Sequence, residues 1–151
     1  MKFMQHVLAV ALGFGVGRLF LYIYSYGLSL EVLSYLSRNQ ALIFIAAFEI
    51  SIPWLVSVVL YLFRFSTSTP IALMAGFGFY EIYYSYYNSQ PLNREFSPWF
   101  FLPLVIYLVA GVVIWQAFKR GRLWVLLSFP LIVVLLSVYN FLIISYATSA
   151  I

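Results

Sequence analysis

The sequence predicts an all-α, polytopic integral membrane protein, and its composition is the main reason. Of the 151 residues, 65% are hydrophobic, 21% are aromatic and only 8% are charged. Soluble domains carry about 25% charged residues, so a soluble fold of this chain would leave apolar surface exposed to water. The polar stretches are short connectors. We therefore expect residues 1–151 to form a single transmembrane domain that crosses the cell membrane several times.

The apolar residues fall into segments of membrane-spanning length. A helix needs about 20 mostly apolar residues to cross the hydrocarbon core. Five segments meet this condition, at about 7–26, 41–63, 70–87, 98–118 and 123–147; the third is the shortest and is rich in tyrosine. Gly27 closes the first segment, and the pairs Thr69-Pro70 and Ser97-Pro98 are typical helix starts. The prediction is a bundle of five transmembrane helices.

The basic residues predict how this bundle is oriented. Five helices would put the N-terminus, the 64–69 loop and the 119–122 turn on one side of the membrane. That side carries five basic residues, Lys2, Arg64, Lys119, Arg120 and Arg122. The opposite side carries only Arg38 and Arg94. Because basic residues concentrate on the cytoplasmic side, we expect the N-terminus in the cytoplasm and the C-terminus outside.

Three charged residues lie deep inside the apolar segments: Arg18, Glu49 and Glu81. A charge at the centre of a membrane costs roughly 2.5–3.5 kcal/mol, so such residues usually have partners or functions. At 1.5 Å per residue, Arg18 and Glu81 lie about 17 Å from the cytoplasmic ends of their helices and Glu49 about 21 Å. These similar depths predict an intramembrane polar cluster of the three, to which the Tyr80 hydroxyl would add a further partner.

Three roles for this cluster stay open at the sequence level. Arg18 could pair with one glutamate and hold the register of the helices. The cluster could instead relay protons, or form a polar site for an ion or a head group. Its charges could also pair with charges on another subunit.

Glycines predict which helices pack closely. Gly13 and Gly17 precede Arg18 in a Gly-x-x-x-Gly spacing, and Gly76 and Gly78 precede Glu81. Small residues allow two helix backbones to approach each other within a membrane. We therefore expect the helices at 7–26 and 70–87 to touch, which would bring Arg18 near Glu81.

Two further polar residues lie in the last two segments. Gln116 is near the inner end of the fourth, and Asn140 is in the outer half of the fifth. Each is predicted to donate an interhelical hydrogen bond, worth about 0.6–2 kcal/mol in membranes.

The residue inventory excludes many kinds of chemistry. Cysteine is absent and histidine occurs once, at His6, so the chain offers no disulfide, no iron–sulfur ligation and no cysteine nucleophile. One histidine near a helix end cannot activate an intramembrane serine or complete a metal site. The eight lysines and arginines are scattered, which argues against a nucleic-acid partner. We expect no catalytic residues, no bound metal and no cofactor.

Three function classes remain. The favoured one is a small non-catalytic subunit of a larger membrane complex, with a respiratory or other energy-converting assembly as a natural host. The second is a transporter, channel or proton-conducting protein that uses Arg18, Glu49 and Glu81. The third is an intramembrane enzyme acting on lipid or quinone. The expected partners are membrane lipids together with other membrane subunits or further copies of this chain.

Overall fold

The computed structural model describes residues 2–27, 35–88 and 101–149, with side chains over 2–23, 35–85 and 101–142. Within these ranges the chain forms five helices: α1 (Lys2–Gly27), α3 (Arg38–Leu62), α4 (Thr69–Asn88), α5 (Leu102–Arg120) and α6 (Arg122–Ser149). Helices α1, α3, α5 and α6 are each long and apolar enough to cross a membrane. The predicted all-helical, multi-pass membrane type is therefore confirmed. The predicted start of the fourth helix at 98 lies outside the described residues.

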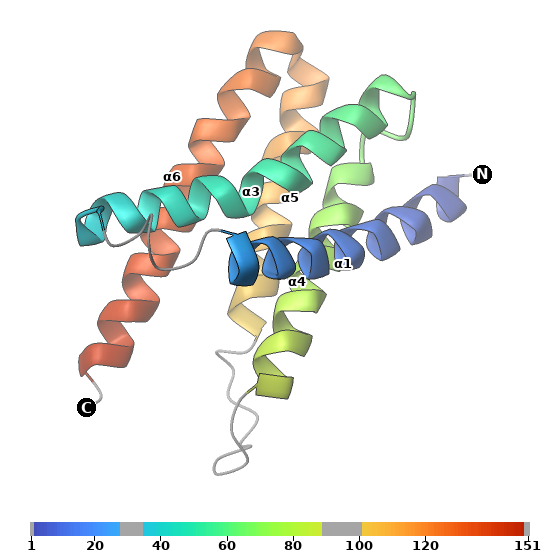
Figure 1. Ribbon diagram of the computed structural model, residues 1–151. Coiled ribbons are helices and arrows are strands. Elements are labelled where there is room, and N and C mark those ends of the chain that lie inside the picture. The colour runs from blue at the N-terminus through green and yellow to red at the C-terminus, as the bar shows by residue number, and fades with distance from the viewer. Residues whose placement is uncertain (1, 28–34, 89–100, 150–151) are drawn as a thin grey trace.

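The helices form two layers that cross each other. Figure 1 shows α1 and α3 running across the front of α4, α5 and α6. α1 packs mainly on α4, α3 packs mainly on α6, and α4, α5 and α6 follow one another in the layer behind. The side chains of α4 therefore meet neighbours on several sides.

The position of α4 explains its composition. This helix carries several tyrosines and Glu81. Among the described helices, the other four are apolar enough to span a membrane and α4 is not. It packs against α1 and α5 and also contacts α3. Its first half, residues 69–78, is buried or half-buried between these helices and does not need the apolar surface that lipid contact requires. Phe79, Tyr83 and Tyr84 further along are exposed.

The core is centred on Phe77 of α4, which is fully buried. Its ring centroid lies 6.0 Å from that of Phe20 on α1 and 4.8 Å from that of Tyr107 on α5. The second contact is edge-on, the geometry that aromatic pairs prefer. Phe77 thus joins three helices, one turn before Glu81.

The first helix begins at Lys2, five residues before the apolar segment from which it was predicted. Its first turns are held by polar contacts with the turn between α3 and α4. His6 Nδ1 lies 2.8 Å from the Lys2 carbonyl oxygen, and His6 Nε2 lies 2.8 Å from Ser68 Oγ. The Ser66 backbone N–H donates to Gln5 Oε1 at 3.3 Å. These bonds extend the helix beyond its apolar part and fix its start beside that of α4.

The turn after α3 closes in a Schellman motif. The Phe65 N–H donates to the Leu60 carbonyl at 3.1 Å, and the Arg64 N–H donates to the Tyr61 carbonyl at 3.0 Å. Arg64 occupies the left-handed position of this motif with a φ of 61°, where glycine is the usual residue. The turn directs the chain back into α4.

Candidate functional site: an interior glutamate pair and an outward arginine

Glycines bring α1 and α4 into backbone contact beside the charged residues. A Cβ atom at Gly13 would collide with the Leu73 carbonyl oxygen on α4, and one at Gly76 would collide with the Val10 carbonyl oxygen on α1. One turn further along α1, a Cβ at Gly17 would lie 2.7 Å from the ring of Tyr80. The two helices cross at these contacts, and Gly17, further along α1, meets Tyr80, further along α4.

Glu49 faces the interior from α3. It is 9% exposed, and its neighbours Ala46 and Ile50 are fully buried. Pro53 follows one turn later inside the same helix. Because proline has no backbone N–H, it cannot donate the helical hydrogen bond to the Glu49 carbonyl oxygen. Two polar groups of residue 49 therefore lie in this part of the interior. One is its side-chain carboxyl group, and the other is its backbone carbonyl group, which lacks the usual helical hydrogen bond.

Glu81 and two residues of α6 complete the interior group. Glu81 lies one helical turn after Phe77 and is partly buried. Asn140 lies one turn after the fully buried Leu136, and its side chain is within hydrogen-bonding reach of the Glu49 carboxyl group. Glu49 and Glu81 are close enough to interact electrostatically, and Tyr139 lies within electrostatic range of both. We call Glu49, Glu81, Tyr139 and Asn140 the interior polar cluster.

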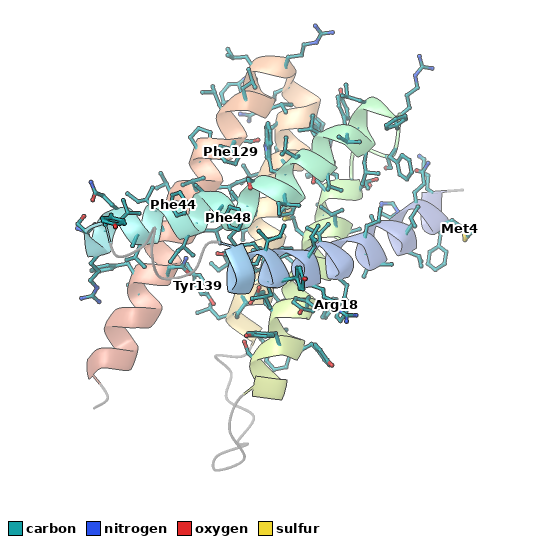
Figure 2. All side chains as sticks on the ribbon, in the orientation of Figure 1. Met4, Arg18, Phe44, Phe48, Phe129 and Tyr139 are labelled. Carbon is teal, nitrogen blue, oxygen red and sulfur yellow. The ribbon has the colours of Figure 1, made fainter. Side chains whose placement is uncertain are left out.

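Arg18 lies on the other side of α1, where it is exposed. Figure 2 shows its side chain beside α4, away from Tyr139 on α6. Tyr80, the residue before Glu81 on α4, lies within electrostatic range of both Glu81 and Arg18. Arg18 is thus turned toward the surroundings of the protein, whereas Glu49 is buried and Glu81 is half-buried.

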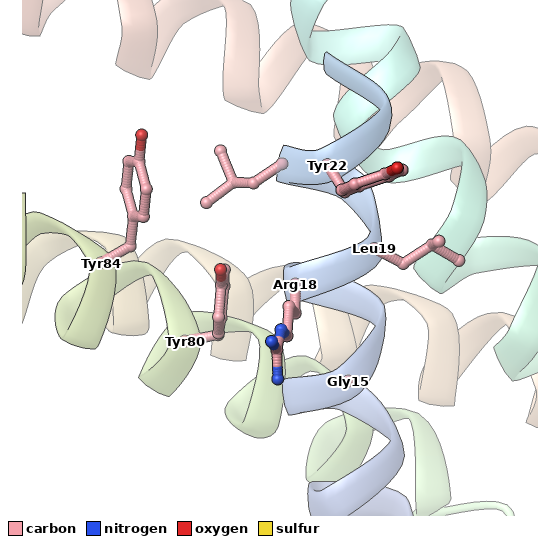
Figure 3. Close-up of a pocket in the computed structure, with 7 residues that line it drawn as sticks. Gly15, Arg18, Leu19, Tyr22, Tyr80 and Tyr84 are labelled. Atoms are coloured by element: carbon pink, nitrogen blue, oxygen red, sulfur yellow. The ribbon is translucent and has the colours of Figure 1, made fainter. Parts of the chain in front are cut away.

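A groove of about 510 Å³ surrounds Arg18. Its lining residues come from α1 and α4 and are Gly15, Arg18, Leu19, Leu21, Tyr22, Tyr80 and Tyr84. Figure 3 shows the guanidinium group extending along α1 toward Gly15, with the Tyr80 ring facing it from α4. A Cβ atom at Gly15 would meet nothing within 4 Å, so the space beside the guanidinium is open.

Tyr80 forms the wall between this groove and the packed helices. Its ring packs edge-on against Phe14 at a centroid distance of 5.1 Å and stacks on Tyr84 at 6.4 Å. The residue is only 7% exposed, and Gly17 leaves the room that its ring occupies. These contacts hold Tyr80 in place, so its position beside Arg18 is defined by packing.

No family model, curated protein or solved structure matches this chain. Its function therefore has to be argued from the geometry alone. No three His, Cys, Asp or Glu side chains lie together as a metal site would require, over the ranges that the structure describes.

The residues predicted from the sequence fall into two groups in the structure. Glu49, Glu81 and Asn140 lie together in the interior, and Arg18 lines the outer groove. Tyr80 also lines this groove and lies within electrostatic range of both Glu81 and Arg18. Gln116 is exposed and lines a groove of about 240 Å³ between α5 and α6 with Trp124 and Ser128 among others. Its hydrogen bond across helices stays a prediction.

Three contributions to this architecture were not predicted from the sequence. Tyr139 was not singled out, although it adjoins Asn140. Gly111 was not recognised as a packing residue, although its Cβ would come within 2.8 Å of Ile71 on α4. The Trp54 indole N–H donates to Ser128 Oγ at 3.1 Å and links α3 to α6. A serine or glycine in an apolar helix is so common that none of these positions stood out.

Proposed function

We propose that this protein is a small non-catalytic subunit of a larger membrane complex, in which a neighbouring subunit covers the Arg18 side of α1. The observation that carries the proposal is the outward position of Arg18. A cation that faces lipid within a membrane is costly, so an intramembrane arginine usually faces a bundle interior, a water-filled cavity or a partner. A partner subunit on α1 would turn this exposed arginine into a buried contact.

The arrangement of the charges favours a subunit over a transporter. A transport path would need the arginine and both glutamates around one wet cavity. Here Glu49 is packed among apolar residues of α3, while Arg18 lines a separate groove on the outside of α1. The interior polar cluster joins residues of α3, α4 and α6, which suits a role in fixing the packing of these helices.

We further propose that all five helices cross the cell membrane, with the N-terminus in the cytoplasm. In Figure 1 the turn between α3 and α4 and the turn at Gly121 both lie in the upper part of the molecule, and the start of α1 is hydrogen-bonded to the first of these turns. Beside the turn at Gly121, Lys119 Nζ lies 3.8 Å from the centroid of the Trp115 ring, and the Arg120 guanidinium group lies over the Trp124 ring. Basic residues paired with tryptophan are typical of a cytoplasmic membrane boundary.

Single cysteines can test this topology, because the natural chain contains none. We expect a membrane-impermeant thiol reagent added to intact cells to label Ser37→Cys and a cysteine placed after Ile151. Thr67→Cys should react only after the membrane is permeabilised. Ser37 and Thr67 are both exposed and both carry a small hydroxyl side chain, so they form a matched pair. Labelling of the C-terminal cysteine and Thr67→Cys from the same side would contradict a membrane crossing by α4.

The complex itself can be tested by gentle extraction. We expect the chain, purified from native membranes through a tag at its C-terminus, to carry at least one other membrane protein in fixed stoichiometry. Intact-complex mass measurement checks this directly. The matched control is the same tag on an unrelated multi-pass protein of similar abundance, which should not capture the same partner.

A lone monomer or an oligomer of this chain alone would contradict the subunit proposal. That result would favour transport, because two carboxyl groups share the interior without a cation beside them among the described residues. Glu49→Gln and Glu81→Gln would then be the variants to compare in proton-flux measurements on liposomes.

A further inference from the structure

We propose that the groove around Arg18 binds the carboxylate of an acidic side chain on a transmembrane helix of a different polypeptide. This inference rests on the proposed function and adds the chemistry of the contact. The groove supplies a guanidinium group, an open space beside it and a wall of tyrosine side chains. A guanidinium group presents two parallel N–H donors that match the two oxygen atoms of a carboxylate.

The shape of the groove fits an approaching helix. Gly15 lies one turn before Arg18 on α1, and because it has no side chain, another backbone can come close to the guanidinium. Leu19 is also exposed on this side, 48% of its surface being accessible, and Leu12 is 38% exposed. An apolar stripe with a small residue beside the charge is the kind of surface that helices use to associate in membranes.

The direction of the Arg18 side chain argues for a protein carboxylate over a lipid phosphate. Arg18 lies nine residues before Gly27, so about 14 Å of helix separate it from the nearer end of α1. To reach the phosphates at that boundary, the side chain would have to extend toward Gly27. It extends instead toward Gly15, further into the apolar part of the helix (Figure 3). An anion that meets it there has to lie within the membrane.

The chain's own acidic residues argue against a second copy as the partner. The sequence contains four of them, Glu31, Glu49, Glu81 and Glu95. Glu49 and Glu81 belong to the interior polar cluster, and Glu31 and Glu95 lie outside the predicted spans and the described residues. The described surface of a second copy therefore presents no intramembrane carboxylate to Arg18. We therefore place the complementary charge on another chain.

Two variants test the contact in different ways, and both use the full-length protein in its native membrane. Arg18→Gln removes the charge and keeps a polar side chain, while Gly15→Leu keeps the charge and fills the space beside it. We expect each to reduce the co-purified partner at least tenfold per copy of this chain. Arg18→Lys should keep more of the partner than Arg18→Gln, because it keeps the charge but loses the paired donors. Arg64→Gln, at an exposed arginine in the turn after α3, should leave the partner unchanged.

A crosslink locates the partner independently of its affinity. Leu12→Cys, one turn before Gly15 on the same exposed surface, creates the only thiol in the chain and leaves the space at Gly15 open, and a benzophenone group can be attached to it. Irradiation in native membranes should join this position to the partner protein. The same probe at Val112→Cys, an exposed site on α5, should not give that product. Unchanged thermal unfolding of each variant in detergent shows that its fold is intact.

The outcomes separate the contact from the subunit function. A wild-type chain that purifies alone would overturn both proposals. A partner that stays bound to Arg18→Gln and to Gly15→Leu would overturn the contact while leaving the subunit function in place. If Arg18→Gln lost a bound anionic lipid but kept the protein partner, the groove would bind a lipid phosphate. That result would overturn the proposal that it binds a protein carboxylate. A crosslink from position 12 to a second copy of this chain would also overturn it.

Discussion

Gly13→Leu is expected to lower the free energy of unfolding by about 3 kcal/mol, the upper end of what an overpacked core costs. The reason is the backbone contact between α1 and α4. Any Cβ atom at position 13 would collide with the Leu73 carbonyl oxygen and lie 3.0 Å from the Phe77 nitrogen. A helix backbone cannot move aside as a flexible side chain can, so the two helices would have to separate. Unfolding in detergent, followed by circular dichroism, measures the loss.

Gly15→Leu is the matched control on the same helix. Position 15 points away from α4, and a Cβ there would meet nothing within 4 Å. Leucine is a better helix former than glycine, so this variant should unfold at the same free energy or up to about 1 kcal/mol higher. Equal losses at positions 13 and 15 would contradict the packing argument, because they would point to a general effect of larger side chains in α1.

The close contact of α1 with α4 could be predicted because it depends on spacing alone. Gly13 and Gly17 are four residues apart, so they lie on one face of a helix. Gly76 and Gly78 are two residues apart, which puts them on nearly opposite faces. In the structure Gly76 meets α1, while Gly78 meets Leu104 of α5. The contact with α5 was not predicted, because Gly111, at which α5 comes close to Ile71 of α4, stands alone in an apolar helix.

The separation of Arg18 from the glutamates could not be predicted, and the cause is physical. Counting residues along a helix gives the depth of a side chain but not the direction in which it points. In a soluble protein the apolar stripe of a helix supplies that direction, because it faces the core. A membrane helix is apolar on nearly every side, so its sequence does not show which face meets the neighbouring helices. Similar depths of Arg18, Glu49 and Glu81 were therefore compatible with one cluster or with two.

Phe77→Ala is expected to lower the free energy of unfolding by about 4 kcal/mol, within the roughly 3–5 kcal/mol range for a buried phenylalanine. Phe77 is fully buried where α1, α4 and α5 meet, and its ring contacts those of Phe20 and Tyr107. Alanine would leave a cavity that three crossing helices cannot close without shifting. Denaturant unfolding of the purified protein in one detergent measures the change.

Phe79→Ala is the control that separates this packing effect from loss of apolar surface. Two residues along the same helix, Phe79 points to nearly the opposite side and is 49% exposed. Lipid or detergent contacts its ring in both the folded and the unfolded chain, so its removal should change the free energy of unfolding by less than about 1 kcal/mol. A comparable loss at both positions would mean that Phe77 is not the centre of the core. A large loss at Phe77 alone would mean that the packing of α1, α4 and α5 around this ring stabilises the fold, because only the buried ring loses contacts.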